Sequence, residues 1–181
     1  MNKDLADVLG NFVNRILKFN ASRFDGVVPS GGEVGEHEAW LAAEMDTRLA
    51  AIVENHEAMR FRQAAAETRA LWAAGNEYLT RAEPWSHFKT DPARAAVGVR
   101  TALNLCAIMA IVAQPIIPSS AGKILDALGV PAGNRTWPTQ TAADLLDVLP
   151  HGLAVTPPDV LFAKIEDEQV EEWKARFGGE G

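Results

Sequence analysis

One stretch of the sequence, DPARAAVGVRTALNLCAIMAIVA at residues 91–113, is apolar on nearly every side. Asp91 suits a helix N-cap, and Pro92 at the first helical position lacks only an N–H that would have no helical partner there. A helix with so little polar surface is buried, so we predict a core helix at about 92–113. Its most apolar segment, residues 103–112, is too short to span a bilayer, and we expect no membrane contact.

Amphipathic periodicity predicts more helices on both sides of this segment. Stretches rich in Gly and Pro separate them, such as DGVVPSGGEVG at residues 25–35. Residues 129–158 are predicted to be irregular, apart from a turn near 142–148. The predicted helices cover residues of about 3–24, 36–57, 60–80, from a cap at Ser119 or Ser120 to 128, and 167–177.

This pattern predicts an all-α fold, an antiparallel helix bundle with an extended C-terminal segment and a short terminal helix. We expect residues 1–130 to form the bundle and residues 131–181 to form an irregular C-terminal extension. No internal repeat and no strong strand alternation appear in the sequence.

The charge of the chain is uneven along its length. The net charge of the 181 residues is −7, which argues against general binding of RNA or DNA. Residues 8–24 carry Arg15, Lys18 and Arg23 and no acid, so they contribute +3 and the remainder carries −10 (−7 − 3). A local basic face on an acidic body is compatible with a specific, localised contact.

The sequence offers no set of residues for catalysis or metal binding. It has no Gly-rich phosphate loop and no HExxH, CxxC or GxSxG motif, and its four histidines are far apart. Cys106 is the only cysteine and lies in an apolar run, where we expect a buried, inert thiol. A lone cysteine excludes a disulfide scaffold and suits a reducing cytoplasm. We therefore predict no catalytic residue and no metal site in this chain.

Asn11 and Arg15 lie one helical turn apart on the first predicted helix. An amide donates and accepts, and a guanidinium offers a planar fork that meets two acceptors. Together they suit the edge of an unpaired base, such as cytosine. The alternative is that both side chains bond to neighbouring helix backbone or to solvent. Asn14 and Lys18 lie on the same polar side of this helix.

Trp85 follows Pro84 in a predicted loop between helices. A Trp held there as an exposed plane is a stacking surface for single-stranded bases, at about 1–3 kcal/mol for each base. The alternative is that Trp85 covers the end of the bundle core.

Several motifs occur in the order seen in one known family. They are DLADVLGNFVNR at 4–15, RFDGVVP at 23–29, NEYLTRAEPW at 76–85, PIIPSSAGKILDALG at 115–129 and LFAKIEDEQV at 161–170. Over nearly the whole chain, this order resembles the anticodon-binding domain of methionyl-tRNA synthetase, a class I aminoacyl-tRNA synthetase.

The resemblance implies a partner and a site. In this family the bundle receives the anticodon loop of methionine tRNA, whose anticodon is CAU. The family's Asn, Arg and Trp that contact the first anticodon base correspond to Asn11, Arg15 and Trp85. Further RNA contacts are expected from Asn14, Lys18, Asn76 and Pro84.

The resemblance also implies a larger, cytoplasmic parent enzyme that attaches methionine to its tRNA. Its catalytic domain binds ATP with Mg²⁺, often carries zinc, and uses HIGH-like and KMSKS-like motifs that this sequence lacks. We therefore expect a fragment that is inactive alone and needs no cofactor. The terminal helix, with Val170, Trp173 and Phe177 along one side, is expected to pack back on the bundle or on the catalytic domain.

Two other readings remain open. The chain could be the anticodon-binding domain of a sister class I synthetase for leucine, isoleucine, valine or cysteine. It could instead be a helical module that docks a protein partner, in which case binding would not depend on Asn11 or Arg15.

Overall fold

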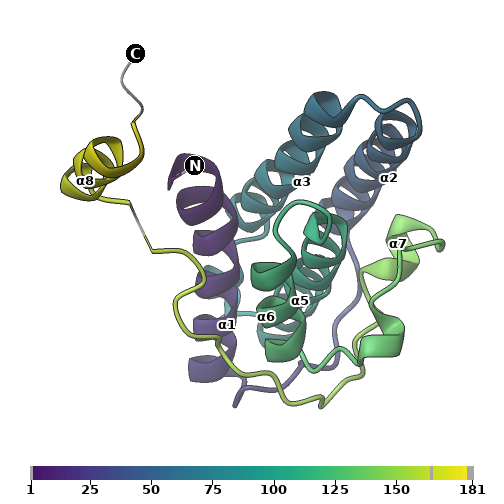
Figure 1. The fold of residues 1–181 in the computed structure, drawn as a ribbon. Coiled ribbons are helices and arrows are strands. Elements are labelled where there is room, and N and C mark those ends of the chain that lie inside the picture. The colour runs from purple at the N-terminus through teal and green to yellow at the C-terminus, as the bar shows by residue number, and fades with distance from the viewer. Residues whose placement is uncertain (1, 164, 179–181) are drawn as a thin grey trace.

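A computed structural model describes residues 2–163 and 165–178 of the chain. The described residues form helices joined by loops, and the only strand-like pairing is one antiparallel bridge between Val27 and Ala154. The all-α bundle predicted from the sequence is thereby confirmed (Figure 1). The elements are η1 (Asn2–Gly10), α1 (Asn11–Arg23), α2 (Glu36–Glu57), α3 (Phe61–Ala82), α4 (Pro84–His87), α5 (Pro92–Ala113), α6 (Pro118–Ala127), η2 (Ala132–Asn134), α7 (Ala142–Leu145) and α8 (Asp167–Phe177).

Helix α5 is the central helix of the bundle. It packs against α1, α3, α4, α6 and α7, and 18 of its residues are buried. The predicted cap is present, since the backbone N–H of Arg94 donates to Oδ1 of Asp91 at 3.0 Å. The helix is long and apolar enough to cross a bilayer by composition, but 94% of its apolar window is buried inside the bundle. Its apolar surface therefore serves as the core of the fold.

Helix boundaries agree with the sequence for α2, α5 and α8 and differ at three other places. Residues 2–10 are wound as a π-helix, so the first predicted α-helix begins only at Asn11. The predicted break after α3 contains a one-turn helix, α4. The predicted serine cap of α6 is wrong: Ile117 precedes the helix, Pro118 occupies its first position, and Ser119 and Ser120 lie inside it.

A buried carboxylate joins three helices at one end of the bundle. Glu38 of α2 is 3% exposed and accepts from the Tyr78 hydroxyl of α3 at 2.6 Å. The Arg94 guanidinium of α5 reaches both oxygens of Glu38, at 2.7 and 3.0 Å. The backbone N–H of Gly35 completes the set at 2.7 Å. Burial alone would raise the pKa of Glu38, but these donors outweigh it and hold the pKa below its ordinary value. We call Glu38, Tyr78 and Arg94 the buried knot.

The segment after α6 wraps around the bundle (Figure 1). Asn104 of α5 holds its first part, because Oδ1 accepts from the backbone N–H groups of Val148 and Leu149 at 2.9 and 2.8 Å. Leu145, Leu146, Leu149 and Val155 join the same apolar core as the bundle helices.

Beyond the bridge at Ala154, the wrapping segment crosses α1 and leads to α8, which stands clear of the bundle in Figure 1. We call residues 158–162 the strap. The domain boundary at 130/131 stays a prediction.

Candidate nucleic-acid interface

Arg15 and Trp85 meet across two elements. The Arg15 guanidinium carbon lies 4.7 Å from the centre of the Trp85 ring, in cation–π geometry. Arg15 is exposed on α1, and Trp85 is half-buried in α4. The structure thus brings together two residues that are 70 positions apart and that the sequence analysis selected separately. Trp85 also packs against the core, so the predicted exposed plane is partly covered in this structure.

Local backbone geometry sets the position of Trp85. Glu83 adopts a left-handed conformation with φ of 38°, which ends α3 and turns the chain. Pro84 then begins α4 and is buried against Gly98 of α5, where an added Cβ would lie 3.2 Å from the Pro84 Cβ. Pro84 is therefore buried at the start of α4, directly before Trp85, and its predicted RNA contact stays a prediction.

An aromatic cluster supports the Trp85 ring. The Phe19 ring meets Trp85 edge-on at 6.4 Å between centroids, and it also contacts Phe24 and Phe88. The Arg23 guanidinium lies 5.5 Å from the Phe88 ring centre. Sequence reasoning missed this support, although Phe19 follows Arg15 by one helical turn and thus lies on the same side of α1.

Asn11 and Asn76 bond to helix backbone. The Asn11 side chain donates from Nδ2 to the carbonyl oxygen of Asp7 at 3.0 Å, four residues earlier in η1. Nδ2 of Asn76 donates to the carbonyl oxygens of Val8 at 3.3 Å and Trp72 at 3.0 Å, and so ties α3 to η1. Asn11 thus makes the bond to helix backbone that was given above as the alternative to base recognition. Asn76 has a structural role here, because its side chain joins two helical segments.

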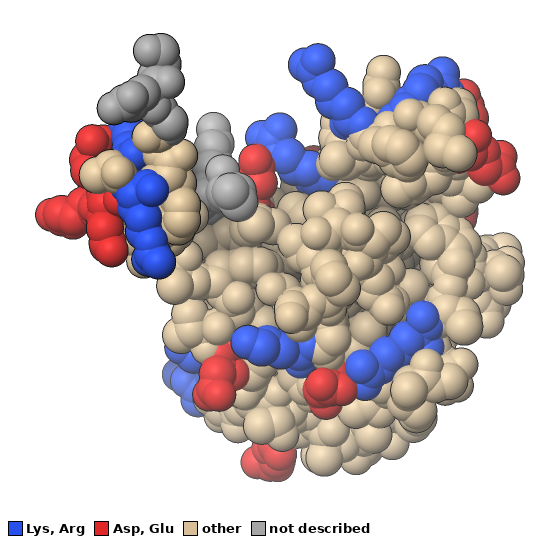
Figure 2. Space-filling view, in the orientation of Figure 1, with Lys and Arg blue, Asp and Glu red and all other residues tan. Residues whose placement is uncertain are grey.

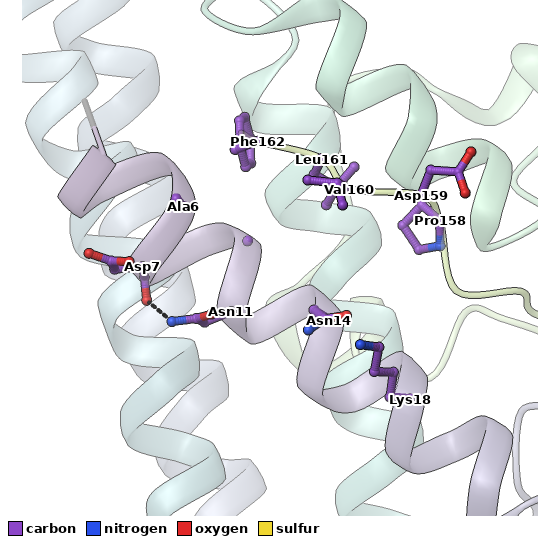
Figure 3. A pocket seen from close by; sticks show the side chains of 11 residues that line it. Ala6, Asp7, Asn11, Asn14, Lys18, Pro158, Asp159, Val160, Leu161 and Phe162 are labelled. Carbon is purple, nitrogen blue, oxygen red and sulfur yellow. Dashed lines mark hydrogen bonds between the residues drawn. The ribbon is translucent and has the colours of Figure 1, made fainter. Parts of the chain in front are cut away.

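A groove of about 510 Å³ runs between the strap on one side and η1 and α1 on the other. In Figure 3, Asn14 and Lys18 extend from α1 into the space beneath Pro158 and Val160, whereas Asn11 turns toward Asp7. Sequence reasoning selected the helix side of this groove but not the strap, which is about 140 residues away along the chain. Only Leu161 and Phe162 of the strap were singled out from the sequence, because they belong to the motif LFAKIEDEQV that resembles the family.

Charge is mixed over the surface. Figure 2 shows basic and acidic side chains interspersed on the visible face, with no continuous basic area. Within the described residues, no three His, Cys, Asp or Glu side chains are grouped so that they could hold a metal ion. Cys106 is fully buried, and burial raises the pKa of its thiol far above the usual range. It is inert, as predicted.

The arrangement defines a helical module with a stacked Arg–Trp pair beside an amide-lined groove, the side-chain types that recognise unpaired bases. The sequence profile of the family described as the anticodon binding domain of methionyl tRNA ligase matches residues 28–181. The chain belongs to this family. The match begins after α1, so Asn11 and Arg15 lie outside it.

Relatives at high identity span α1 as well. The chain is 66% identical over 180 residues to a methionine–tRNA ligase of Maricaulis maris and 60% identical over 183 residues to that of Hyphomonas neptunium. Each match covers 99% of this chain and 32% of the relative. The chain thus spans about a third of the length of these relatives.

Solved structures agree with this assignment. The methionyl-tRNA synthetase of Mycobacterium tuberculosis bound by methionyl-adenylate superposes with a TM-score of 0.74 at 32% identity, over 90% of this chain and 32% of that one. Its apo form gives a TM-score of 0.76 at 31% identity, over 91% of this chain and 33% of that one.

Proposed function

We propose that this domain binds the anticodon loop of methionine tRNA and reads the first base of its CAU anticodon at Arg15, Trp85 and Asn11. The observation that carries the proposal is the Arg15 guanidinium held 4.7 Å from the Trp85 ring centre at the surface of the bundle. A planar cation and an aromatic ring together offer stacking and edge hydrogen bonds, and recognition of unpaired bases uses both.

Each residue has a distinct role in this proposal. Trp85 supplies the plane, which Phe19 supports from its edge. Arg15 presents guanidinium donors to the O2 and N3 acceptors of cytosine. Asn11 exchanges its 3.0 Å bond to the Asp7 carbonyl for a bond to RNA at little net cost, because one hydrogen bond replaces another.

Arg15 lies over the ring of Trp85 in this structure. A base that stacks directly on the Trp85 ring must displace the Arg15 guanidinium. The displaced guanidinium then lies beside the edge of the base. The cation–π contact at an exposed site contributes only about 0.5–1 kcal/mol, so a stacked base compensates for its loss.

We further propose that the domain belongs to a soluble, cytoplasmic methionine–tRNA ligase that attaches methionine to its tRNA. ATP with Mg²⁺, and zinc where present, would bind the catalytic domain outside this chain, so this fragment would be inactive alone. Trp173 and Phe177 of α8 are 43% and 70% exposed and offer an apolar surface to that catalytic domain. Protection of Trp173 from a quencher in the isolated, monomeric chain would contradict this docking.

A titration at one stated low salt concentration tests the RNA proposal. The probes are an RNA hairpin with a CAU loop and the same hairpin with a UAU loop. We expect about tenfold tighter binding of CAU, in line with about 1–3 kcal/mol for a bidentate contact. Arg15→Ala and Trp85→Ala should weaken CAU binding and bring the ratio of the UAU to the CAU dissociation constant closer to one.

Arg62→Ala is the matched control for the loss of one positive charge. Arg62 is exposed near the opposite end of α3 from Trp85, so its loss should leave the ratio unchanged. Equal binding of both hairpins by every variant would contradict the proposed site, and the titration is repeated with the full-length ligase if the isolated domain binds neither. The sister-synthetase alternative predicts a preference for another anticodon.

A further inference from the structure

A second pocket lies between α5 and the wrapping segment. Its outer wall is built by residues 129–153, just before the bridge at Ala154. No residue of α1 or α4 lines it, and α1 and α7 lie on opposite sides of α5 in Figure 1. The pocket is therefore separate from the Arg15–Trp85 pair. Its floor is one face of α5, at Asn104, Ala107, Ile108 and Ile111.

Contacts within the fold hold the outer wall of this pocket in place. On one side, Oδ1 of Asn104 accepts from the backbone N–H groups of Val148 and Leu149 at 2.9 and 2.8 Å. On another side, Nε of Arg135 donates to the carbonyl oxygen of Val130 at 2.9 Å and closes the loop at η2. The shape of the pocket is therefore set by the fold itself.

The lining of this pocket is uncharged. Of the described residues that line it, none is an Asp, Glu, Lys or Arg, although such residues make up 23% of the chain. Charged residues next to it along the chain are paired elsewhere: Arg135 with Asp126 at 2.5 Å, and Asp147 with Arg100 at 2.8 Å. An ion that left water for this pocket would find no opposite charge, which is costly. The lining therefore disfavours nucleotides and free amino acids.

The size and the walls of the pocket suit a small molecule. Its volume of about 580 Å³ lies within the roughly 300–1,000 Å³ that is typical of small-ligand sites. Its interior is mainly aliphatic, and Trp137 adds a half-buried indole ring on which another ring can pack. Exposed amide and hydroxyl side chains, which donate and accept hydrogen bonds, are also part of the lining: Asn134, Thr136, Thr139 and Gln140.

The apolar surface lies inside the pocket rather than around its mouth. Among the described lining residues, Val148 is the one large aliphatic or aromatic side chain that is mainly exposed, at 57%. A protein partner needs a broad contact surface, of which an apolar patch is the usual sign. The concave apolar interior therefore favours a small molecule over a protein face.

We propose that this pocket is a binding site for an uncharged aromatic small molecule. The ring of the ligand packs between Trp137 and the α5 floor, and its polar edge meets the amide and hydroxyl side chains of the lining. The inference is independent of the proposed RNA site, because the two sites share no residue.

Three compounds with the same ring system and different charges test the inference. The probes are indole, which is neutral, indole-3-acetate, which is an anion, and tryptamine, which is a cation at neutral pH. Each is titrated into the isotope-labelled 181-residue chain, and NMR follows the backbone amides of Val130, Trp137 and Val148. We expect saturable shifts with indole and a dissociation constant of about 1 mM or lower, an ordinary affinity for a ligand of this size. Both charged compounds should bind several-fold more weakly.

Two pairs of variants locate the site. Gly133 lines the pocket, and Gly122 lies outside it on α6; an added Cβ at either glycine meets no atom within 4 Å, and neither φ is left-handed. Gly133→Leu should fill the pocket and weaken indole binding about fivefold or more, whereas Gly122→Leu should leave it unchanged. Trp137→Ala should weaken it similarly, with Trp173→Ala on α8 as the matched control. Thermal unfolding confirms that each variant is folded.

Each outcome decides either the site or the class of ligand. Saturable shifts at the lining amides that Gly133→Leu reduces and Gly122→Leu preserves support the site. Equal binding of the three compounds overturns the assignment of an uncharged ligand. Indole shifts that do not saturate at these amides, or that both Gly133→Leu and Trp137→Ala leave unchanged, overturn the site.

Discussion

The buried knot and the Arg15–Trp85 pair both join an arginine to an aromatic residue across helices, but they are built for different purposes. In the knot, every partner is held at 2.6–3.0 Å around a carboxylate that is 3% exposed. At Trp85, an exposed guanidinium rests on a half-buried ring at 4.7 Å, and no carboxylate of the described residues forms a salt bridge with it. The first arrangement stabilises one fold, whereas the second leaves a guanidinium free to exchange its contact, as the proposed RNA site requires.

The largest effect should come from removing the carboxylate of the knot. Glu38→Ala leaves a half-buried guanidinium and a buried Tyr78 hydroxyl without their partner. We expect a loss of about 3 kcal/mol in the free energy of unfolding, the lower end of the range for broken buried pairs, because Arg94 still reaches solvent. Urea unfolding measures it. Glu44→Ala, which breaks a half-exposed pair with Arg48 on the same helix, should cost under about 1 kcal/mol. Equal losses would mean that burial does not distinguish the two pairs.

The next effect should come from the anchor of the wrapping segment. Asn104→Ala leaves the backbone N–H groups of Val148 and Leu149 without their acceptor. We expect a loss of about 2 kcal/mol in unfolding free energy, within the range for unsatisfied buried donors. Hydrogen exchange should show faster exchange at these two amides than in α5. Unchanged protection of both amides would argue against the anchoring role.

A smaller effect should follow from protonating Glu38, because the neutral acid keeps some of its hydrogen bonds. The folded pKa lies below the ordinary value of 4.5, so the carboxylate contributes stability at higher pH that is lost as the pH falls through the folded pKa. The unfolding free energy of the native chain should therefore fall more steeply below pH 4.5 than that of Glu38→Gln. Parallel pH profiles would contradict the assignment.

The smallest effect on stability should come from Arg15→Ala. An exposed cation–π contact contributes about 0.5–1 kcal/mol, so the unfolding free energy should drop by no more than that. Thermal unfolding checks this value beside Arg62→Ala. A loss of 3 kcal/mol or more, as predicted for the knot, would mean that Arg15 is structural and would remove the contrast between the two regions.

Local rules explain which parts of the fold were predictable. The bounds of α2, α5 and α8 follow from periodicity and, for α5, from the Asp91–Pro92 start. The π-helical turn pattern of residues 2–10 and the one-turn helix at Pro84 were missed. Both depend on packing between segments: Asn76 of α3 bonds to the Val8 carbonyl, and Pro84 fits against Gly98 of α5.

The candidate site, like the fold, was predictable from the sequence only in part. The residue types and the helical spacing selected Asn11, Asn14, Arg15 and Lys18, since one face of one helix is readable from sequence. The stacking of Arg15 on Trp85 and the strap opposite Asn14 depend on segments that are distant along the chain. Both are tertiary features with no local signal.

A double-mutant cycle between protein and RNA tests the central claim most directly. It combines Arg15→Ala with a change of the first anticodon base from C to U and measures four dissociation constants at one salt concentration. We predict a coupling of about 1–3 kcal/mol, because Arg15 can discriminate these bases only by touching the first one. A coupling near zero, with CAU still preferred by the Arg15→Ala variant, would show that another part of the molecule reads this base.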